Sequence, residues 1–309
     1  MELRQLRYFV GVSEAGSLLK ASGRLHIAQP ALGQQITALE REVGARLFDR
    51  SSRGVALTEA GRVFLEHAKI VLADAERARL AVRELADEPR GEVALGLPTT
   101  VALAANLPIL SACRNRLPQV RLKVVEAYSG FLREWLQSGR LDLAVMFGES
   151  QDADLAKRPL LDDSLVLVTS AANKVPARLP IAALSRWPMV LPGREHGLRR
   201  IIDEACAPLG ITLDVVAEIE SLGSVKLAAE AGLGSTILPA VSVAAEVASG
   251  RLRTAVIDSR VMSRRVVCAT NIARPATVAS SAVTTLVQQV IRDMVASGAW
   301  PARWVGGEV

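Results

Sequence analysis

Residues 28–44 decide the architecture of the N-terminal part of the chain, and they read AQPALGQQITALEREVG. Apolar residues recur within this stretch at intervals of three and four, which predicts a helix over 29–43. Pro30 suits the first turn, where its missing N–H breaks no helical hydrogen bond, and Gly44 suits a C-terminal stop. The helix opens with polar residues, so its N-terminal end presents hydrogen-bonding groups.

Two shorter helical patterns precede this stretch. Leu6 and Phe9 fall at helical spacing in the first, Gly16 interrupts that pattern, and Ser17 offers the N-cap of a second helix. A tight connection over 26–28 joins the second helix to the third. Two helices joined by a tight turn, the second opening with polar residues, match a helix-turn-helix with its recognition helix at 29–43. Such a unit indicates recognition of duplex DNA.

Candidate contacts to DNA follow from this arrangement. At the recognition helix we expect base-edge or backbone contacts from Gln29, Pro30, Gln34 and Gln35. Arg50 and Arg53 lie on the turn after the helix, next to Arg46, and are the candidates for phosphate or minor-groove contacts of a wing. The formal net charge of +5 also favours an anionic partner, although net charge alone discriminates weakly.

Several short motifs occur in a fixed order over the first sixty residues: LRQLRYF at 3–9, AQPAL at 28–32, Leu39-Glu40, GARLFDR at 44–50 and LTEAG at 57–61. They resemble the N-terminal signature of LysR-type transcriptional regulators, and the length of 309 residues and the pattern of the remaining chain resemble that family as well. The resemblance implies a winged helix-turn-helix, a linker helix that pairs two heads, a two-lobed effector domain like periplasmic binding proteins, and a tetramer. Gly33 stands where the family usually has serine, and Ala28 where serine is frequent; these departures concern site preference and not DNA binding itself.

A single long helix is expected from Thr58 to about Asp87, because residues 62–87 contain neither glycine nor proline. Apolar residues advance along it by alternating steps of four and three, the spacing of a coiled-coil seam: Phe64, Ala68, Val71, Ala75, Ala78, Val82 and Leu85. We interpret this helix as a dimerisation element; the alternative is an amphipathic helix lying on its own domain. The predicted divisions are a DNA-binding domain at 1–57, a linker at 58–88 and an effector-binding domain at 91–309.

Beyond residue 91, short apolar runs alternate with helical patterns, as in a parallel α/β sheet. We expect a first set of strands at 92–97, 121–128 and 141–147, and a second set at 165–169, 189–191, 215–219 and 235–238. A strand at 265–270 and a helix at 280–296 return to the first set. The expected fold class is therefore α/β, with one lobe at about 91–161 and 266–300, the other at about 162–265, and hinges near 160–163 and 261–265.

Ligands of open parallel sheets bind beyond the carboxyl ends of the strands, against helix N-termini. This rule selects an effector site from both lobes: Thr99, Thr100, Ser129, Phe147, Arg194 and Ser221. Four hydroxyl-bearing side chains favour a small polar effector; the alternative is that they only cap helices. The basic residues at 194, 196, 199 and 200 suggest an anionic effector, unless they are simply solvated.

The sequence carries no recognisable catalytic, cofactor or metal motif. Cys113, Cys206 and Cys268 are widely spaced and are interpreted as buried free thiols, and the three histidines lack the spacing of metal ligands. The glycines at 232 and 234 follow a helical pattern and precede a strand, the reverse of a dinucleotide-binding loop. Without a secretory signal or a long apolar run, we expect a cytoplasmic protein with no membrane partner and no cofactor.

These observations predict a transcription factor and not an enzyme. It would bind double-stranded promoter DNA as a dimer of heads and respond to a small-molecule effector held between the lobes. The resemblance, and not the periodicity, implies a homotetramer; RNA polymerase is included among the candidate partners. A solute-binding protein would explain the two lobes but not the first ninety residues, and an α/β enzyme has only the fold class behind it. Effector, operator and sign of regulation are left open.

Overall fold

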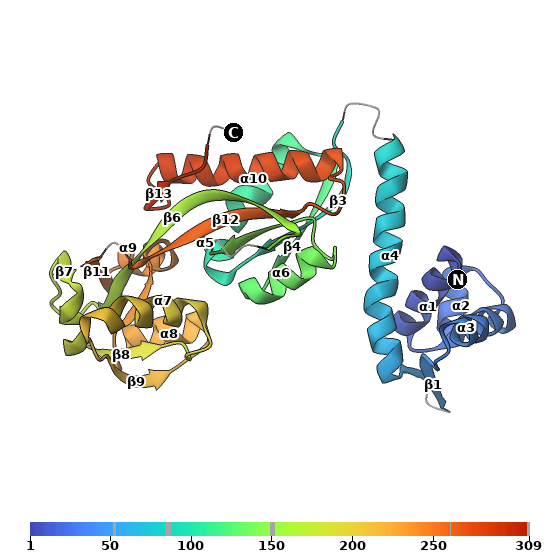
Figure 1. Cartoon of the computed structure of the whole chain (residues 1–309), viewed down its shortest axis with the longest axis horizontal. Coiled ribbons are helices and arrows are strands. Elements are labelled where there is room, and N and C mark those ends of the chain that lie inside the picture. Colours follow the sequence, from blue (N-terminus) through green and yellow to red (C-terminus); the bar gives the residue numbers. More distant parts are fainter. Residues whose placement is uncertain (52–53, 84–87, 149–151, 260, 308–309) are drawn as a thin grey trace. The chain divides into compact units, whose positions relative to one another are not determined.

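The structure is a computed structural model that describes the chain except for residues 52–53, 84–87, 149–151, 260 and 308–309 (Figure 1). The chain divides into two compact units, Met1–Asp87 and Glu88–Val309, and each is described by itself. No helix in the described residues is long and apolar enough to cross a membrane.

The N-terminal unit is a winged helix-turn-helix followed by a long helix. Its elements are α1 (Leu3–Ala15), α2 (Leu18–Leu25), α3 (Gln29–Val43), the antiparallel strands β1 (Phe48–Ser51) and β2 (Gly54–Leu57), and α4 (Glu59–Arg83). The predicted caps are confirmed: Ser17 Oγ accepts a hydrogen bond from Lys20 N, and Gly44 ends α3 in the left-handed conformation with φ of 74°. The bounds of α3 are those expected from the sequence.

A small aromatic cluster forms the centre of this unit. Phe9 is fully buried, and its ring centroid lies 5.0 Å from that of Phe48 and 5.1 Å from that of Phe64. Ala68 is also buried in the same core. The first two positions of the expected seam on α4 therefore pack within their own unit, while Val71, 40% exposed, is available to a partner. Val82 and Leu85 lie outside the side chains that the structure describes.

The second unit has two lobes with separate cores. In the first lobe, α5 (Thr99–Arg116) and α10 (Val278–Ala296) contribute to one core, and α6 (Ser129–Gln137) contributes to a smaller cluster. Its strands are β3 (Gly91–Leu97), β4 (Val120–Glu126), β5 (Leu143–Phe147) and parts of β6 (Leu155–Ser170) and β12 (Ser263–Asn271). A short strand, β13 (Ala302–Trp304), follows α10.

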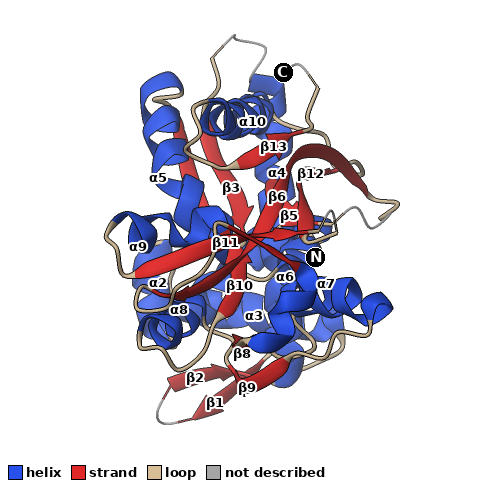
Figure 2. Ribbon diagram, turned by 90° about the vertical axis from the view of Figure 1, so that its left-hand side faces the viewer, coloured by secondary structure: helices blue, strands red, loops and turns tan. Residues whose placement is uncertain are grey.

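The second lobe has its own core between residues 165 and 262. Its elements are β7 (Arg178–Pro180), β8 (Pro188–Leu191), α7 (Gly197–Cys206), β9 (Asp214–Glu218), α8 (Leu222–Glu230), β10 (Thr236–Pro239), α9 (Ala244–Ala248), β11 (Leu252–Asp258) and the 3-10 turns η1 (Ile181–Arg186), η2 (Ala207–Leu209) and η3 (Ala240–Val243). Figure 2 shows helices beside the strands of this lobe as well as the first.

The long strands β6 and β12 connect the lobes, and they run side by side as antiparallel neighbours (Figure 1). The sheet follows the order β4-β3-β5-β12-β6-β11-β7. β3 is parallel to β4 and β5, as expected, but β12 is antiparallel to both of its neighbours, so the sheet is mixed. The sequence pattern predicts only the second half of β6, because its first half is rich in polar residues.

The three cysteines are free and buried, as expected. Burial raises the pKa of the Cys268 thiol to about 11, so this thiol is protonated at neutral pH. These cysteines therefore behave as small apolar core residues.

Candidate DNA-binding face and inter-lobe site

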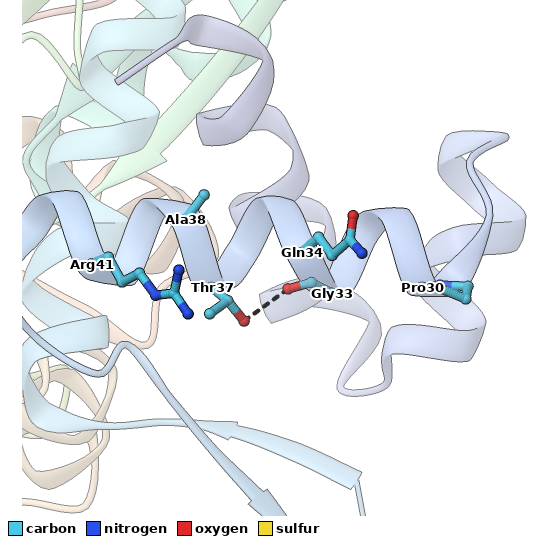
Figure 3. A pocket seen from close by; sticks show the side chains of 6 residues that line it. All are labelled: Pro30, Gly33, Gln34, Thr37, Ala38 and Arg41. Atoms are coloured by element: carbon cyan, nitrogen blue, oxygen red, sulfur yellow. Dashed lines mark hydrogen bonds between the residues drawn. The ribbon is translucent and has the colours of Figure 1, made fainter.

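The outward side of α3 forms a shallow depression that six residues line: Pro30, Gly33, Gln34, Thr37, Ala38 and Arg41 (Figure 3). Their spacing places them on one side of the helix, opposite the buried Leu32, Ile36 and Leu39. The Thr37 hydroxyl donates to the Gly33 carbonyl at 3.0 Å, so it is held against the helix backbone. The face combines amide, hydroxyl and guanidinium groups, which suit base edges and phosphates.

The expected contact residues of α3 do not all share this face. Pro30 and Gln34 lie on it, whereas Gln29 is exposed at the first residue of the helix and Gln35 is half-buried. Sequence reasoning missed Thr37, Ala38 and Arg41. The same periodicity that marks the buried side could have found them, because they lie opposite it.

The wing is fixed to the rest of the N-terminal unit by polar contacts. Glu40 Oε1 accepts hydrogen bonds from the backbone N–H groups of Leu47 at 2.8 Å and Phe48 at 3.1 Å. Val55 N donates to the Gly16 carbonyl at 3.0 Å, and a Cβ at Gly54 would lie only 2.7 Å from that oxygen, so glycine is required there. These contacts tie the hairpin both to α3 and to the turn after α1.

Two expected DNA contacts of the wing cannot be placed. Arg50 lies in β1, where its backbone is paired with Val55, but its side chain is outside the described part of the structure. Arg53 lies wholly outside the described residues. Both stay predictions.

In the second unit, two of the expected effector residues, Thr100 and Phe147, contact Arg264, and a third, Ser129, contacts Phe147. The Nη2 atom of Arg264 donates to Thr100 Oγ1 at 2.8 Å, and its guanidinium carbon lies 3.8 Å from the centroid of the Phe147 ring. Phe147 N donates to Ser129 Oγ at 3.3 Å. Thr100, Ser129, Phe147 and Arg264 are called the inter-lobe cluster from here on.

Arg264 is 6% exposed and forms a buried ion pair with Asp163, which is fully buried. Its Nε and Nη2 atoms donate to Asp163 Oδ2 at 3.1 and 2.8 Å, and Trp300 Nε1 donates to the other oxygen, Oδ1, at 3.2 Å. Burial lowers the pKa of Arg264, while the Asp163 carboxylate opposes that shift. The direction of the guanidinium is therefore set by a carboxylate that a tryptophan also holds.

The second lobe meets the first at His196. Its ring lies edge-on to that of Tyr128, with centroids 5.5 Å apart, and its Nδ1 atom accepts a hydrogen bond from Leu198 N at 3.1 Å at the start of α7. Burial lowers the pKa of His196; Glu220 raises it and Arg264 lowers it further. The imidazole is therefore neutral at neutral pH and is an element of contact between the lobes.

The remaining expected effector residues are less constrained. Thr99 and Arg194 are exposed, and Ser221 Oγ accepts from Ser224 N at 3.4 Å, so Ser221 caps α8. The suggestion that Arg199 serves an anionic effector is wrong, because this side chain is buried and pairs with Asp203 at 3.0 Å and Glu218 at 3.1 Å. Arg264, which sequence reasoning missed, is the buried cation of the cluster.

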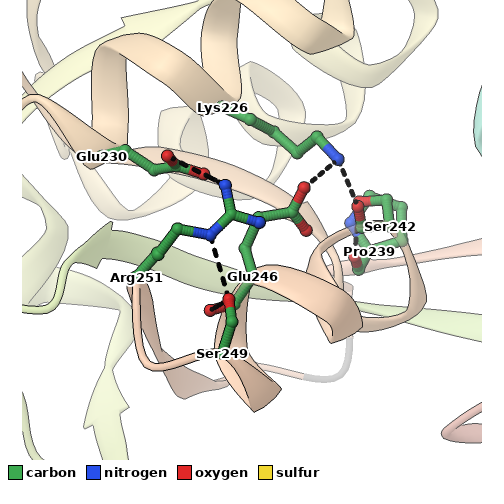
Figure 4. A network of polar contacts seen from close by, with 7 residues as sticks. All are labelled: Lys226, Glu230, Pro239, Ser242, Glu246, Ser249 and Arg251. Carbon is green, nitrogen blue, oxygen red and sulfur yellow. Dashed lines mark hydrogen bonds and ion pairs between the residues drawn. The ribbon is translucent and has the colours of Figure 1, made fainter.

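Ion pairs connect α8 to neighbouring segments of the second lobe (Figure 4). Lys226 Nζ pairs with Glu246 Oε1 at 2.6 Å and donates to the Ser242 carbonyl at 3.2 Å, which connects α8 to α9 and η3. Arg251 pairs with Glu230 at 3.1 Å. The charges of Lys226 and Arg251 are therefore matched within the second lobe.

Comparison with protein families identifies both units. Residues 3–62 match the model of the bacterial regulatory helix-turn-helix protein, lysR family, and residues 86–293 match the LysR substrate binding domain. The chain belongs to the LysR family of transcriptional regulators. It is a DNA-binding transcriptional regulator with an effector-binding domain, and its fold is the winged helix-turn-helix followed by a two-lobed α/β domain that the sequence predicts.

Relatives of this LysR-family regulator are themselves regulators. The nitrogen assimilation regulatory protein nac of Klebsiella aerogenes is 37% identical over 241 residues, which cover 77% of this chain and 78% of that protein. The probable RuBisCO transcriptional regulator of Cyanidioschyzon merolae is 30% identical over 304 residues, or 94% and 97% of the two chains.

Solved structures share the fold. Full-length OxyR from Pseudomonas aeruginosa is 26% identical, with a TM-score of 0.69 over 94% of this chain and 95% of that one. CbnR, solved in complex with its target DNA, is 24% identical with a TM-score of 0.71 over 95% and 99% of the two chains, a likeness that shows the shared fold. In this LysR-family regulator the inter-lobe cluster falls within the matched substrate binding domain, whereas Trp300 lies beyond it.

Proposed function

We propose that this regulator reads promoter DNA with the outward face of α3 and responds to a small anionic effector at the inter-lobe cluster. The DNA half rests on the face of α3 opposite its buried side, which carries the polar side chains of Gln34, Thr37 and Arg41. A cytoplasmic location is part of this proposal, because the regulator would act on promoter DNA, and contact with RNA polymerase stays a prediction.

The effector half is carried by one observation. Thr100 and Phe147 contact the buried guanidinium of Arg264, and Ser129 contacts Phe147; all three come from the carboxyl ends of strands or from the helix starts that follow them. Nε and Nη2 of Arg264 are held by Asp163 and Thr100, whereas Nη1 has no hydrogen bond within the described residues. This end of the guanidinium suits a carboxylate or another planar anion, and the neighbouring hydroxyls suit the other polar groups of such a molecule. His196 on the second lobe supplies a group that a bound molecule could contact from the other side.

Assembly is proposed to use two surfaces, each covered by a second copy of the chain. On α4, Val71 is 40% exposed and belongs to the predicted seam. On α5, Leu103, Leu107 and Leu110 are 57%, 79% and 37% exposed, and their spacing places them on one side of the helix. Exposed apolar stripes of this kind favour association, which supports a dimer through the linker helix 58–88 and a homotetramer through the effector domains.

The DNA proposal is tested by selecting duplexes from a random pool with the full chain, then measuring affinity for a selected and a scrambled duplex. Gln34→Ala should reduce the affinity for the selected duplex by about 1–3 kcal/mol and leave the scrambled one nearly unchanged. Arg41→Ala should weaken both alike and lower the salt dependence by about one unit. Gln137→Ala, an exposed helical glutamine of the other unit, is the matched control. An equal loss of affinity for the selected and the scrambled duplex in Gln34→Ala would contradict the proposal.

The effector proposal is tested by a thermal-shift screen of carboxylates, phosphates, sugars and amino acids on the full chain, followed by calorimetry on any molecule that stabilises it. Thr100→Val keeps the shape of the side chain but removes its hydroxyl, and should cost about 1–3 kcal/mol of effector binding. Thr212→Val, at an exposed position of the second lobe, is the control. Intact affinity of Thr100→Val would remove this residue from the site.

A further inference from the structure

The C-terminal segment runs along the connection between the two lobes. Strand β13 pairs antiparallel with β6, with Ala302 opposite Asp163 and Trp304 opposite Leu161. After it, Val305 N and Gly306 N both donate to the Leu160 carbonyl, at 2.8 and 3.0 Å. The family match ends at residue 293, so this segment lies outside the part of the chain that the substrate binding model describes.

The paired part of β6 is the hinge itself. Leu161 belongs to the core of the first lobe and Leu165 to that of the second. Where the chain returns to the first lobe, Met262 belongs to the core of the second lobe and Val266 to that of the first. The hinge therefore comprises residues 161–165 of β6 and residues 262–266, which include the start of β12. The hinge thus consists of three adjacent strands, because β13 pairs with β6 beside the two connecting strands β6 and β12.

The side chains repeat this three-stranded arrangement. Each of the two aspartates in the hinge binds one residue of β12 and one of the C-terminal segment: Asp163 binds Arg264 and Trp300, and Asp162 binds Arg265 and Arg303. The hydrogen bond from Arg265 and that from Arg303 hold the pKa of Asp162 below its ordinary value against the effect of burial, so this carboxylate is ionised at neutral pH.

The segment is firmly attached to the first lobe. Trp300 is fully buried in that core, and its backbone N–H donates to the Met294 carbonyl at 3.0 Å. At Gly306 an added Cβ would lie 2.5 Å from the Trp304 ring and 3.1 Å from the Pro159 carbonyl oxygen, so the chain packs closely there. The segment is therefore a fixed part of the fold and can resist movement of the hinge.

A continuous set of polar contacts leads from this segment to the inter-lobe cluster. Trp300 Nε1 binds Oδ1 of Asp163, Oδ2 of Asp163 binds Arg264, and Arg264 Nη2 binds Thr100. Because each oxygen of the carboxylate has its own donor, loss of the indole N–H frees the carboxylate to rotate, and the guanidinium with it. Among the described residues, the polar contact of the Trp300 indole is with Asp163 and not with the cluster residues, so Trp300 acts through Asp163.

We infer that β13 is a third strand of the hinge within the C-terminal segment 300–306, and that Trp300, through Asp163, positions Arg264 and Thr100 and holds the two lobes in one arrangement. The positioning of Thr100 for an effector rests on the proposed function. The effect on the lobe arrangement does not, and it exists without any bound molecule.

The inference is tested by measuring the distance between the lobes in the full chain. Spin labels on cysteines introduced at Arg121 and Leu209, both exposed, report on the first and second lobe, and the native cysteines are buried. Labelled protein is mixed with an excess of unlabelled protein, so that the measured distances join two labels on the same copy and not labels on different copies of an oligomer. We expect Trp300→Phe and Arg303→Gln to broaden or shift the distribution of distances between the labels. Amide exchange in peptides covering 161–165 should become roughly tenfold faster, because loss of one hydrogen bond makes local opening of the strand more favourable by about that factor.

Matched controls separate this role from general packing. Trp304→Phe makes the same change in the same segment, at an indole for which the described structure gives no hydrogen bond, and Arg178→Gln removes an exposed ion pair with Asp258 in the second lobe. Both should leave the distance distribution unchanged. A folded Trp300→Phe with the distribution of the original chain, or an equal change in Trp304→Phe, overturns the inference.

If Trp300→Phe does not fold, Arg303→Gln decides alone, because the Arg303 side chain is 76% exposed and its loss leaves the core intact. An unchanged distribution in that variant overturns the inference. No effector is needed for these measurements. Failure of the effector proposal, seen as intact affinity in Thr100→Val, would therefore be distinguishable from failure of the hinge inference.

Discussion

The contact between Glu40 and the wing makes a quantitative prediction. One carboxylate oxygen accepts the backbone N–H groups of Leu47 and Phe48, whose side chains are fully buried or nearly so. Hydrogen bonds to a charged group are worth about 1.5–3 kcal/mol each, and Glu40 is half-buried, so water replaces part of that. We expect Glu40→Ala to lower the free energy of unfolding of the N-terminal unit by about 2–4 kcal/mol, and Glu40→Gln, which keeps one acceptor oxygen, by about 1 kcal/mol.

The distribution of tryptophans provides an internal control for this measurement. All four tryptophans, Trp135, Trp187, Trp300 and Trp304, belong to the second unit, so their fluorescence during urea unfolding reports on that unit alone and should not change. Hydrogen exchange of peptides covering 3–15 and 44–50 reports on the N-terminal unit. Affinity for duplex DNA should fall as well, because the wing loses its attachment to α3.

Glu42→Ala is the matched variant for this test. Glu42 lies on the same helix, but it is exposed and pairs only with the N-terminal amine in the described contacts, an arrangement worth about 0–1 kcal/mol. Equal exchange in Glu40→Ala and Glu42→Ala would refute the reasoning, since it would mean that the two backbone bonds contribute no more than an exposed ion pair.

Three further predictions follow from the described contacts. A Cβ added at Gly33 would meet nothing within 4 Å, so Gly33→Ala should stabilise the N-terminal unit by up to about 1 kcal/mol in thermal melts. Gly33→Ser should also fold, and it should change the duplex that is preferred in a binding selection. The pKa of His196 is lowered in the folded state, so the free energy of unfolding should fall as pH drops below about 6.5. Urea titrations at pH 7 and pH 5 measure this fall. It should be smaller in His196→Asn than in the original chain, because asparagine keeps an acceptor that can cap α7 but does not titrate. Val71→Asp should dissociate the dimer in sedimentation, and an unchanged oligomer would exclude the α4 seam as its interface.

Local signals predict the helix-turn-helix well. The start of α2 at Ser17 and the end of α3 at Gly44 depend on residues within a few positions of each boundary, and the buried side of α3 follows its own periodicity. The strands of the wing have four residues each and carry no clear alternation, so their pairing depends on contacts such as Glu40 with Leu47, seven positions away. Such contacts leave no mark in a local pattern.

The hinge shows why the residues of the inter-lobe cluster were expected only in part from the sequence. The rule for strand ends finds Thr100 and Phe147, since each follows or ends a recognisable strand. Arg264 is 164 positions from Thr100 and 101 from Asp163, in a polar stretch that reads as a loop. Only the pairing of β12 with β6 brings these residues together, and neither strand is apolar at that point.

A buried ion pair is weak support for stability, because desolvation of both charges offsets most of their attraction. The main consequence of the pair between Arg264 and Asp163 is therefore the fixed orientation of the guanidinium, and not a large contribution to the free energy of unfolding. Asp163 has one oxygen on Trp300 and the other on Arg264, which leaves the guanidinium a single direction, toward Thr100 and over the Phe147 ring. An apolar replacement could fill the same space, but it could not present a cation at the point where the lobes meet. The geometry at the hinge thus joins the two proposals for this regulator: the charge offered to an effector and the arrangement of the lobes depend on the same carboxylate.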